Sequence, residues 1–443
     1  MLSLLSAELA RMDRARAPDI RQRYGLVRSC DGGLVTASGL AAPVGTLCRI
    51  ADADREVAAE VVGFRDGLSL LMLLGDTTSL RPGLHVHPED TAGMVAVGEA
   101  FLGRAVDALG RPIDGGPAIR ARDLWPLAGR REGALERASV TEPFDCGIRA
   151  VNALTTLGIG QRTGIVAGSG VGKSVLIDMI ADGAECDFAV VGLIGERARE
   201  VSDFVDRHMR GERRGRTVVV AVPADHAANL RLRGARLATA MAEHFRAQGK
   251  RVLLVLDSLT RVAHAAREIG LALGEPAAAR GYPPSALAAI TGLVERAGNS
   301  ATSGGAVTGL YTVLADGDDG NDPVVDTARA ILDGHIVLSR ALAARGQYPA
   351  IDVPASLSRV MAGIIGEEHG ELARRFRELA ADYEANRDLV LMGAYRPGAD
   401  PRVDRAMAMH DALAAFVRQR AGEHCGLADS VAALAAVLGN DAG

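Results

Sequence analysis

Apolar runs alternate with helix-compatible stretches through the middle of the chain, from residue 151 to about residue 365. The runs hold five to nine residues and are rich in Val, Ile and Leu, as is typical of strands buried on both faces. Longer stretches with helical periodicity, such as NLRLRGARLATAMAEHFRAQG, separate them. This alternation predicts βαβ units on a mostly parallel sheet. The predicted strands are GIVAG, DFAVVGLIG, RTVVVAV, RVLLVLD and AVTGLYTVL.

The two ends of the chain have different patterns. From about Tyr24 to Val95, short alternating apolar runs are broken by Gly, Asp and Pro, which predicts a small β-barrel. Its predicted strands are GLVTASG, TLCRIA, EVAAEVVGF, LSLLMLL and LHVHP. Beyond the middle region, GELARRFRELAADYEANRDLVLMG and PRVDRAMAMHDALAAFVRQRAG have helical periodicity. We therefore expect an N-terminal β-barrel over residues 21–95, an α/β core over residues 96–365 and an α-helical C-terminal domain over residues 366–443.

Residues 1–20, MLSLLSAELARMDRARAPDI, form a separate segment with apolar residues three or four positions apart and arginines in its second half. This pattern predicts a short amphipathic helix. Two interpretations remain open. The helix packs on its own chain or frays in solvent, as N-terminal helices often do, or it docks on a partner or an anionic membrane surface, as basic amphipathic segments can.

Composition and charge argue against several classes of protein. The net charge of -5, the pI near 6.1 and the aromatic content of 3% disfavour nucleic-acid binding, which needs basic surface and stacking residues. No apolar run approaches the roughly 18 to 20 residues that span a bilayer, and Leu2–Leu5 is too short for a signal-peptide core. The five cysteines are scattered singly, without metal-ligand spacing, and fit a reducing compartment. We expect a cytoplasmic protein that binds no nucleic acid.

The stretch GIVAGSGVGKSVL has a strand-like entry, a glycine-rich turn and a helix-compatible exit. Such a turn lets backbone N–H groups point at a phosphate, and the helix N-terminus adds partial positive charge. Lys173 can then reach β- and γ-phosphate oxygens, while the Ser174 hydroxyl is placed for Mg²⁺. The strict pattern has Gly where this chain has Ala167, at the position most tolerant of change. The predicted nucleotide-binding residues are Gly168, Ser169, Gly170, Val171, Gly172, Lys173, Ser174 and Val175.

Two other predicted strands are followed by carboxylates. LLVLDSLTR places Asp257 where a carboxylate would hold a water of the Mg²⁺ shell, and an N-cap aspartate is the alternative. VVGLIGERARE places Glu196 near the phosphate crevice, where it could align an attacking water, and a surface salt-bridge pair is the alternative. From the residues alone, both alternatives remain open.

In this order, these motifs resemble the hexameric ATPase family that includes catalytic subunits of rotary ATP synthases and the ATPases of type III protein export. The resemblance covers nearly the whole chain and implies an N-terminal β-barrel, a RecA-like P-loop NTPase core of α/β class and a C-terminal α-helical domain. Export ATPases also resemble this chain in having Ala at position 167. The passages that narrow the match to the export branch are GQRTGIVAGSGVGKSVL, VVGLIGERAREV, VLLVLDSLTRVAHAAREI, GEPAAARGYPPSALAAITGLVERAGN, GDDGNDPVVDTARAILDGHIVLSR and GQYPAIDVPASLSRVM.

The resemblance implies a role for each matched residue. Lys173 and Ser174 match the phosphate and Mg²⁺ residues, and Asp257 matches the Walker B carboxylate. Glu196 matches the catalytic glutamate that orients water, and Arg197 matches the arginine of the GER motif. The implied substrate and cofactor are therefore ATP and Mg²⁺.

Functional roles for Tyr348 and Arg359 are implied only by the resemblance. Tyr348, in QYPAID, matches the tyrosine that stacks on adenine, and by itself it could be a core tyrosine before a proline turn. Arg359, in ASLSRVM, matches the arginine finger that reaches the γ-phosphate of a neighbouring subunit, and by itself it could be a solvated helix residue. Because one chain carries both Glu196 and Arg359, the resemblance implies a homo-oligomer in the form of a ring of six.

The resemblance implies an ATPase of the flagellar export apparatus, which releases substrates from chaperones and promotes their entry at the export gate. RQRYGLVRSCDGGLVTASGLAAPVGTLCRI and LGRPIDGG resemble flagellar members more than virulence members. The implied partners are a dimeric regulatory protein at the N-terminus, export-gate membrane proteins, a stalk protein and chaperone–substrate complexes, with peripheral association at the cytoplasmic face of the inner membrane. The alternatives are an injectisome ATPase, a rotary synthase subunit, an RNA or DNA translocase and a non-catalytic adaptor.

Overall fold

A computed structural model describes residues 24–52, 55–75, 80–89, 93–130, 132–209, 212–314 and 322–439. These residues form two compact units, and the division falls between Gly93 and Met94. The amphipathic helix predicted for residues 1–20 lies outside the described residues.

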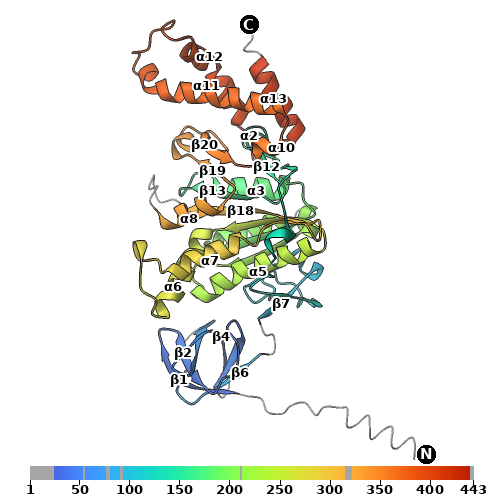
Figure 1. Ribbon diagram of the computed structural model, residues 1–443, viewed down its shortest axis with the longest axis vertical. Helices are drawn as coiled ribbons and strands as arrows, with labels where there is room; N and C mark the ends of the chain where they lie inside the picture. Colours follow the sequence, from blue (N-terminus) through green and yellow to red (C-terminus); the bar gives the residue numbers. More distant parts are fainter. Residues whose placement is uncertain are drawn as a thin grey trace, which may run out of the picture. The chain divides into compact units, whose positions relative to one another are not determined.

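The first unit is a closed barrel of six antiparallel strands in the order β1-β2-β5-β4-β3-β6 (Figure 1). Closure leaves no free strand edge, and buried side chains such as Val27, Ile50 and Leu71 fill the interior. The sequence pattern did not single out β1, because its second half alternates poorly between buried and exposed positions. The strands are β1 (Gly25–Asp31), β2 (Leu34–Ser38), β3 (Leu47–Asp52), β4 (Arg55–Arg65), β5 (Leu68–Leu73) and β6 (His85–Pro88).

The second unit is built on a ten-stranded sheet whose main order is β20-β19-β13-β18-β16-β14-β15-β8. Strands β8 to β19 along this path are parallel, and β20 is antiparallel to β19. The five apolar runs that the sequence predicts as strands are β13, β14, β15, β16 and β18. The strands of this unit are β7 (Met94–Val97), β8 (Arg104–Val106), β9 (Asp123–Pro126), β10 (Arg137–Ala138), β11 (Pro143–Phe144), β12 (Leu157–Gly158), β13 (Arg162–Ala167), β14 (Phe188–Ile194), β15 (Thr217–Val222), β16 (Arg251–Asp257), β17 (Gly298–Ser300), β18 (Ala306–Leu314), β19 (Gly334–Leu338) and β20 (Ile351–Ser358).

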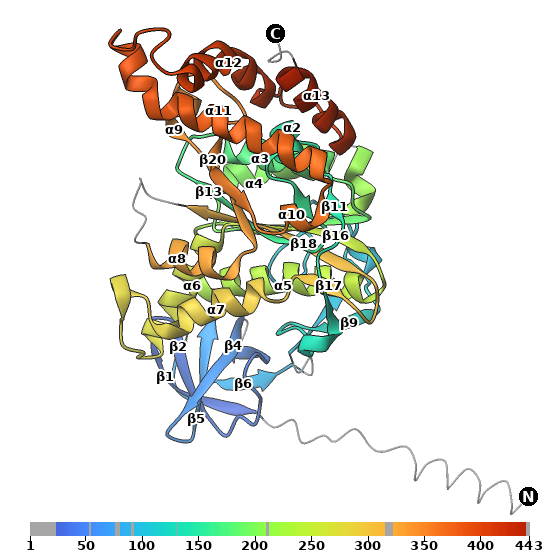
Figure 2. The same cartoon turned by 45° about the horizontal axis from the view of Figure 1, so that its top comes forward.

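Helices cover both faces of this sheet, with α3 on one face and α5, α6 and α7 on the other (Figures 1 and 2). The α-helices of the core are α2 (Arg149–Leu154), α3 (Lys173–Gly183), α4 (Ala198–His208), α5 (Ala228–Ala247), α6 (Leu259–Ala272), α7 (Pro284–Val294), α8 (Pro323–Ile331), α9 (Arg340–Ala344) and α10 (Met361–Ile364). Short 3-10 helices occur at η1 (Glu99–Phe101), η2 (Ala134–Glu136), η3 (Glu212–Arg216) and η4 (Ala279–Gly281). A sheet covered on both faces explains why its strands are continuous apolar runs.

Three helices follow the sheet: α11 (Glu367–Leu391), α12 (Pro401–Val417) and α13 (Leu427–Gly439). All three contact α2, and their buried side chains join the same hydrophobic core as the sheet. The start of α12 is set by Asp400, whose side chain accepts a hydrogen bond from the backbone N–H of Arg402, and by Pro401 in the first turn.

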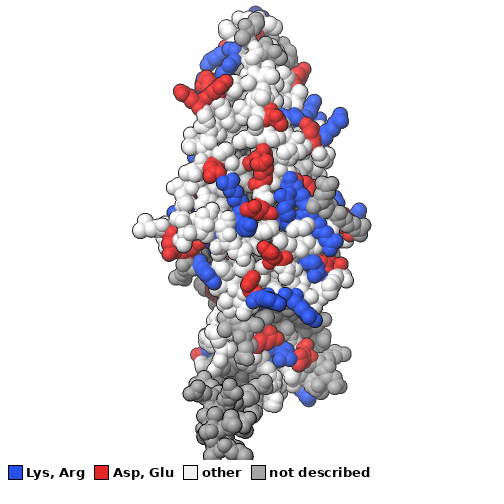
Figure 3. Space-filling view, turned by 90° about the vertical axis from the view of Figure 1, so that its right-hand side faces the viewer, with Lys and Arg blue, Asp and Glu red and all other residues white. Residues whose placement is uncertain are grey.

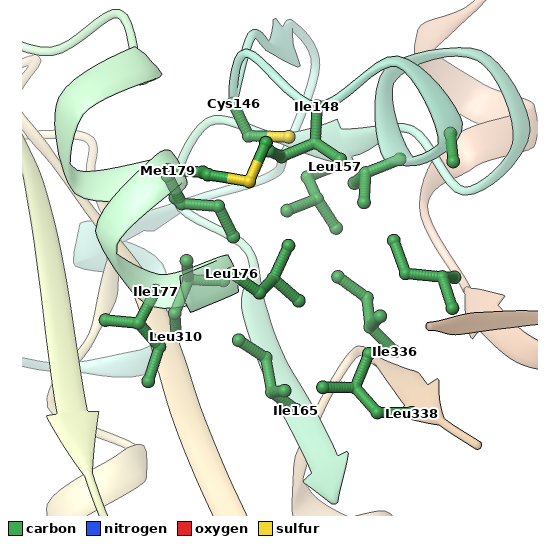
Figure 4. Packing of buried hydrophobic residues seen from close by; sticks show 14 of the residues in the cluster. Cys146, Ile148, Leu157, Ile165, Leu176, Ile177, Met179, Leu310, Ile336 and Leu338 are labelled. Atoms are coloured by element: carbon green, nitrogen blue, oxygen red, sulfur yellow. The ribbon is translucent and has the colours of Figure 1, made fainter. Parts of the chain in front are cut away.

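The core beneath α3 positions the loop that precedes this helix. Leu176, Ile177 and Met179 of α3 pack with Ile165 and Leu310 of the sheet (Figure 4).

On the face shown in Figure 3, Lys and Arg side chains lie among Asp and Glu side chains. Within the described residues, no helix is both long enough and apolar enough to cross a membrane.

Candidate functional site

The phosphate loop joins the end of β13 to the start of α3. Gly170 and Gly172 adopt left-handed backbone conformations, with φ of 77° and 89°, which L side chains rarely adopt. A Cβ atom at Gly168 would lie 2.8 Å from Nε of Arg340, so a larger residue there would displace the flexible end of that side chain. The loop therefore folds into a tight turn directly before the N-terminus of α3, where backbone N–H groups favour an anion.

Lys173, Glu196 and Asp257 come together beside this loop. The Lys173 Nζ atom donates to Oε1 of Glu196 at 3.1 Å and also donates to Oδ1 of Asp257. Their side chains are 11%, 12% and 6% exposed, respectively. The contact forms because β13, β14 and β16 are parallel, so that their carboxyl ends meet at one edge of the sheet.

The sequence left open whether Asp257 is the N-cap of a helix and whether Glu196 forms a surface salt bridge. Asp257 is the last residue of β16, and the N-cap of α6 is Ser258, whose side chain accepts a hydrogen bond from the backbone N–H of Arg261. Glu196 is largely buried against Lys173, which differs from a surface salt-bridge pair. Both carboxylates thus belong to the site beside the phosphate loop.

The charges of this cluster act on one another. Burial, followed by the negative charge of Asp257, raises the pKa of the Glu196 carboxyl above its usual range, and Lys173 opposes this shift. Burial lowers the pKa of Lys173, but the carboxylates of Asp257 and Glu196 outweigh burial and raise it overall. Lys173 therefore remains a cation that holds two carboxylates close together.

Two further residues, Thr312 and Arg261, lie near this cluster. Thr312 of β18 is fully buried, and its Oγ1 atom donates to Oδ1 of Asp257 at 2.6 Å. Arg261 has a buried Nε atom without a hydrogen-bond partner among the described residues, and a Cβ atom at Gly195 would lie 2.8 Å from its side chain. Neither residue has a local signal in the sequence, because Asp257 ends a strand and so does not share a helix with Arg261, and GLYTVL marks no site at Thr312.

A cavity of about 730 Å³ adjoins the other side of the loop. It is lined by Gly172, Val175 and Tyr348, and by the segment 418–421 that follows α12. The Tyr348 residue is 45% exposed and is not a core tyrosine. The volume lies in the range of ligand pockets. No sequence motif marks segment 418–421, so its contribution to the cavity could not be predicted.

A smaller cavity of about 220 Å³ lies between α3 and α4. Its lining includes Ser174, Glu196 and Asp257. A hydroxyl and carboxylates are the oxygen ligands that Mg²⁺ accepts, usually one or two from the protein beside phosphate oxygens. The residues present therefore fit a magnesium site, in which the Ser174 hydroxyl would bind the ion and the Asp257 carboxylate would hold it through a water.

Among the described residues, neither candidate arginine forms a hydrogen bond or ion pair with Lys173, Glu196 or Asp257. The Arg197 side chain is 83% exposed and pairs with Glu200 at 3.6 Å. Arg359 is exposed, follows the end of β20 and donates to the backbone carbonyl of Arg329 at 3.2 Å. It is not within a helix.

Strand register locates Arg359 relative to the loop of its own chain. Ala167, at the phosphate-loop end of β13, pairs with Leu338 of β19. Ser358, the neighbour of Arg359, pairs with Gly334 at the opposite end of β19. Four residues of strand separate the two ends, which corresponds to about 13 Å. The Arg359 backbone thus lies far from the phosphate loop of its own chain.

Two family models match the chain. The model of the ATP synthase alpha/beta family, nucleotide-binding domain, matches residues 147–358, and the T3SS EscN ATPase C-terminal domain matches residues 365–436. A flagellum-specific ATP synthase of Pseudomonas aeruginosa is 48% identical over 92% of this chain and 91% of the relative. A type 3 secretion system ATPase of Sinorhizobium fredii is 44% identical over 92% of this chain and 91% of the relative.

Solved structures of the assembled ATPase EscN from enteropathogenic E. coli are also similar. One has a TM-score of 0.87 and 37% identity, and covers 94% of this chain and 100% of that chain. Another, in complex with the central stalk EscO, has a TM-score of 0.85 and 36% identity with the same coverage.

The chain belongs to the ATP synthase alpha/beta family, in the branch that carries the type III secretion ATPase C-terminal domain. It is an ATPase. The family, the fold class and the enzymatic activity predicted from the sequence are confirmed by these similarities.

Proposed function

We propose that this protein hydrolyses Mg-ATP to energise type III protein export during assembly of the bacterial flagellum. The contact of Lys173 with Glu196 and Asp257 beside the phosphate loop carries the catalytic part of this proposal. Similarity to a flagellum-specific relative at 48% identity supports the flagellar part.

Nucleotide binding reorganises the charges around Lys173. The N–H groups of the loop and of the first turn of α3 bind the phosphates, and the Lys173 ammonium moves its hydrogen bonds from the carboxylates to phosphate oxygens. Glu196 is then free to accept a hydrogen bond from the attacking water and to orient it toward the γ-phosphate. Its raised pKa reflects burial beside Asp257.

Ser174 and Asp257 would hold the magnesium ion, which supplies charge neutralisation at the β- and γ-phosphate oxygens when bound. Thr312 fixes the Asp257 carboxylate through its hydrogen bond of 2.6 Å. Tyr348 offers an exposed ring at the 730 Å³ cavity, on which adenine can stack.

Arg359 acts on the site of a neighbouring subunit. Its distance from its own phosphate loop supports a finger supplied in trans, and its exposure leaves it free to reach a second chain. The active form is therefore a homo-oligomeric ring, for which six subunits are our proposal. Arg197, exposed at the start of α4, is assigned to the same subunit boundary.

The proposed partners follow from the same family. A stalk protein is supported by the EscN structure that contains the central stalk EscO. We also propose a dimeric regulatory protein at the N-terminus, export-gate membrane proteins and chaperone–substrate complexes, with the enzyme at the cytoplasmic face of the inner membrane. The domain limits 1–20, 21–95, 96–365 and 366–443 remain part of this proposal.

An injectisome ATPase is the second candidate, favoured by the 44% identical relative named for type 3 secretion. Replacing the chromosomal gene with a Lys173→Ala version distinguishes the two. We expect cells without flagellar filaments and with normal secretion of virulence proteins. Filamented cells that have lost secretion of virulence proteins would establish the injectisome function, and filamented cells with normal secretion would contradict both.

A further inference from the structure

An ion-pair cluster joins α3 and α4, the two helices that border the reaction site. His208 is the last residue of α4, and its side chain is 5% exposed. Its Nε2 atom lies 3.1 Å from Oδ1 of Asp178, and its Nδ1 atom lies 3.1 Å from Oδ1 of Asp182. Both aspartates belong to α3. Since neutral imidazole has a single N–H group, donation to both carboxylates requires the imidazolium form.

Electrostatics favour that charged form. Burial by itself would lower the pKa of His208, but the hydrogen bonds to Asp178 and Asp182 outweigh burial and raise the pKa to about 9. Arg207, beside it on α4, donates to Oδ2 of Asp178 at 2.8 Å, and the C-terminal end of a helix also favours a cation. From the segment after α4, Arg213 donates to the carbonyl of Ala184 at the end of α3.

The cluster includes one of the three buried residues of α4. Val201, Phe204 and His208 are the buried residues of this helix. The Phe204 ring packs on the His208 ring with 4.0 Å between centroids. Loss of the His208 ion pairs would leave α4 held by the Arg207–Asp178 pair and by its apolar side chains, so the helix could shift relative to α3.

Such a shift would reach the catalytic groups. Helix α3 begins with Lys173, and α4 begins two residues after Glu196. The 220 Å³ cavity that contains Glu196 and Asp257 is lined by both helices, through Ser174 on α3 and Phe204 on α4 among others. The distance between the helices therefore sets the width of this cavity.

We propose that His208 is a positioning residue for ATP hydrolysis. Its imidazolium, held between Asp178 and Asp182, fixes α4 against α3 and thereby holds the Glu196 carboxylate at the phosphate loop. This inference rests on the proposed role of Glu196. His208 itself touches neither nucleotide nor water, and it acts through the placement of α4.

The test compares steady-state ATP hydrolysis by His208→Gln, His208→Lys and wild type across Mg-ATP concentrations. Because a misplacement of about 1 Å can cost on the order of 100-fold in rate, we expect His208→Gln to lose about 10- to 100-fold in kcat with KM nearly unchanged. His208→Lys keeps a cation between the aspartates and should recover most of kcat. His85→Gln, the same change at an exposed histidine of the barrel, is the control and should match wild type.

The pH dependence of kcat is a second readout, and a simple loss of packing around His208 would not shift it. Asp182→Asn removes one carboxylate from His208, which lowers the pKa of the imidazolium, so the alkaline limb of kcat should move to lower pH than in wild type. This variant also decides the matter if His208→Gln does not fold. An unmoved limb would overturn the proposal.

Two further results would overturn it: wild-type kcat in His208→Gln, or failure of a folded His208→Lys to recover kcat. Glu196→Gln, measured in parallel, separates this inference from the proposed function. Normal turnover in Glu196→Gln would overturn the role of Glu196 and with it this inference. Loss of turnover there with normal kcat in His208→Gln would overturn this inference alone.

Discussion

Replacement of Arg359 by alanine tests whether each catalytic site is completed by a neighbouring subunit. Strand register separates the Arg359 end of β19 from the phosphate-loop end by four residues, or about 13 Å. The variant therefore keeps Lys173, Glu196 and Asp257 of its own chain intact. We expect unchanged Mg-ATP binding and assembly, with kcat reduced by about 10³- to 10⁵-fold, the range of an arginine finger.

Mixing the variant with Lys173→Ala subunits tests the supply in trans. One subunit then has an intact phosphate loop and the other an intact finger. In a randomly mixed ring at equal amounts, about one quarter of the interfaces combine the two, so about one quarter of the wild-type rate should return. The assay is ATP hydrolysis per subunit, with sizing to establish that mixed rings form. Wild-type activity in Arg359→Ala alone, or no recovery in mixed rings, would refute the reasoning. Arg111→Ala, at an exposed arginine paired with Asp107, is the control and should stay within about twofold of wild type.

Three further predictions concern the same site. Thr312→Val removes the hydrogen bond to the Asp257 carboxylate, so the free energy of unfolding in urea should fall by about 1.5–3 kcal/mol. ATP hydrolysis should also need a higher Mg²⁺ concentration. If neither value changes, Thr312 does not fix the Asp257 carboxylate. Tyr348→Ala loses base stacking worth about 1–3 kcal/mol, so KM for ATP should rise about 5- to 150-fold with kcat near wild type, and an unchanged KM would contradict the adenine assignment. Because burial raises the pKa of Glu196 to about 7 in the folded chain, its contribution to stability is lost as pH rises from its usual pKa to that value. Thermal unfolding should therefore find the stability of Glu196→Gln relative to wild type increasing up to about pH 7 and constant above it, and an equal difference at all pH values would contradict this.

Much of the central fold could be predicted from the sequence because strands buried on both faces are continuous apolar runs. The strand β1 was missed since GLVRSCD alternates poorly, and its place is fixed by pairing with β2 and β6, which no local pattern encodes. The carboxylates at 196 and 257 were predictable from their positions after apolar strands.

Other features of the site depend on tertiary packing. Thr312 meets Asp257 because β18 lies beside β16 in the sheet order, although 55 residues separate them in sequence. The segment 418–421 reaches the large cavity because α12 ends there. The outward direction of Arg197, in contrast to Glu196 beside it, follows from its position at the N-cap of α4.

The most direct test of the account is turnover by Glu196→Gln, measured together with Mg-ATP binding at equilibrium. The amide keeps the size of the side chain and removes the carboxylate that orients water. The account predicts binding close to wild type and loss of most of the turnover. A wild-type rate of hydrolysis would contradict it, because the carboxylate beside Lys173 would then have no part in the reaction.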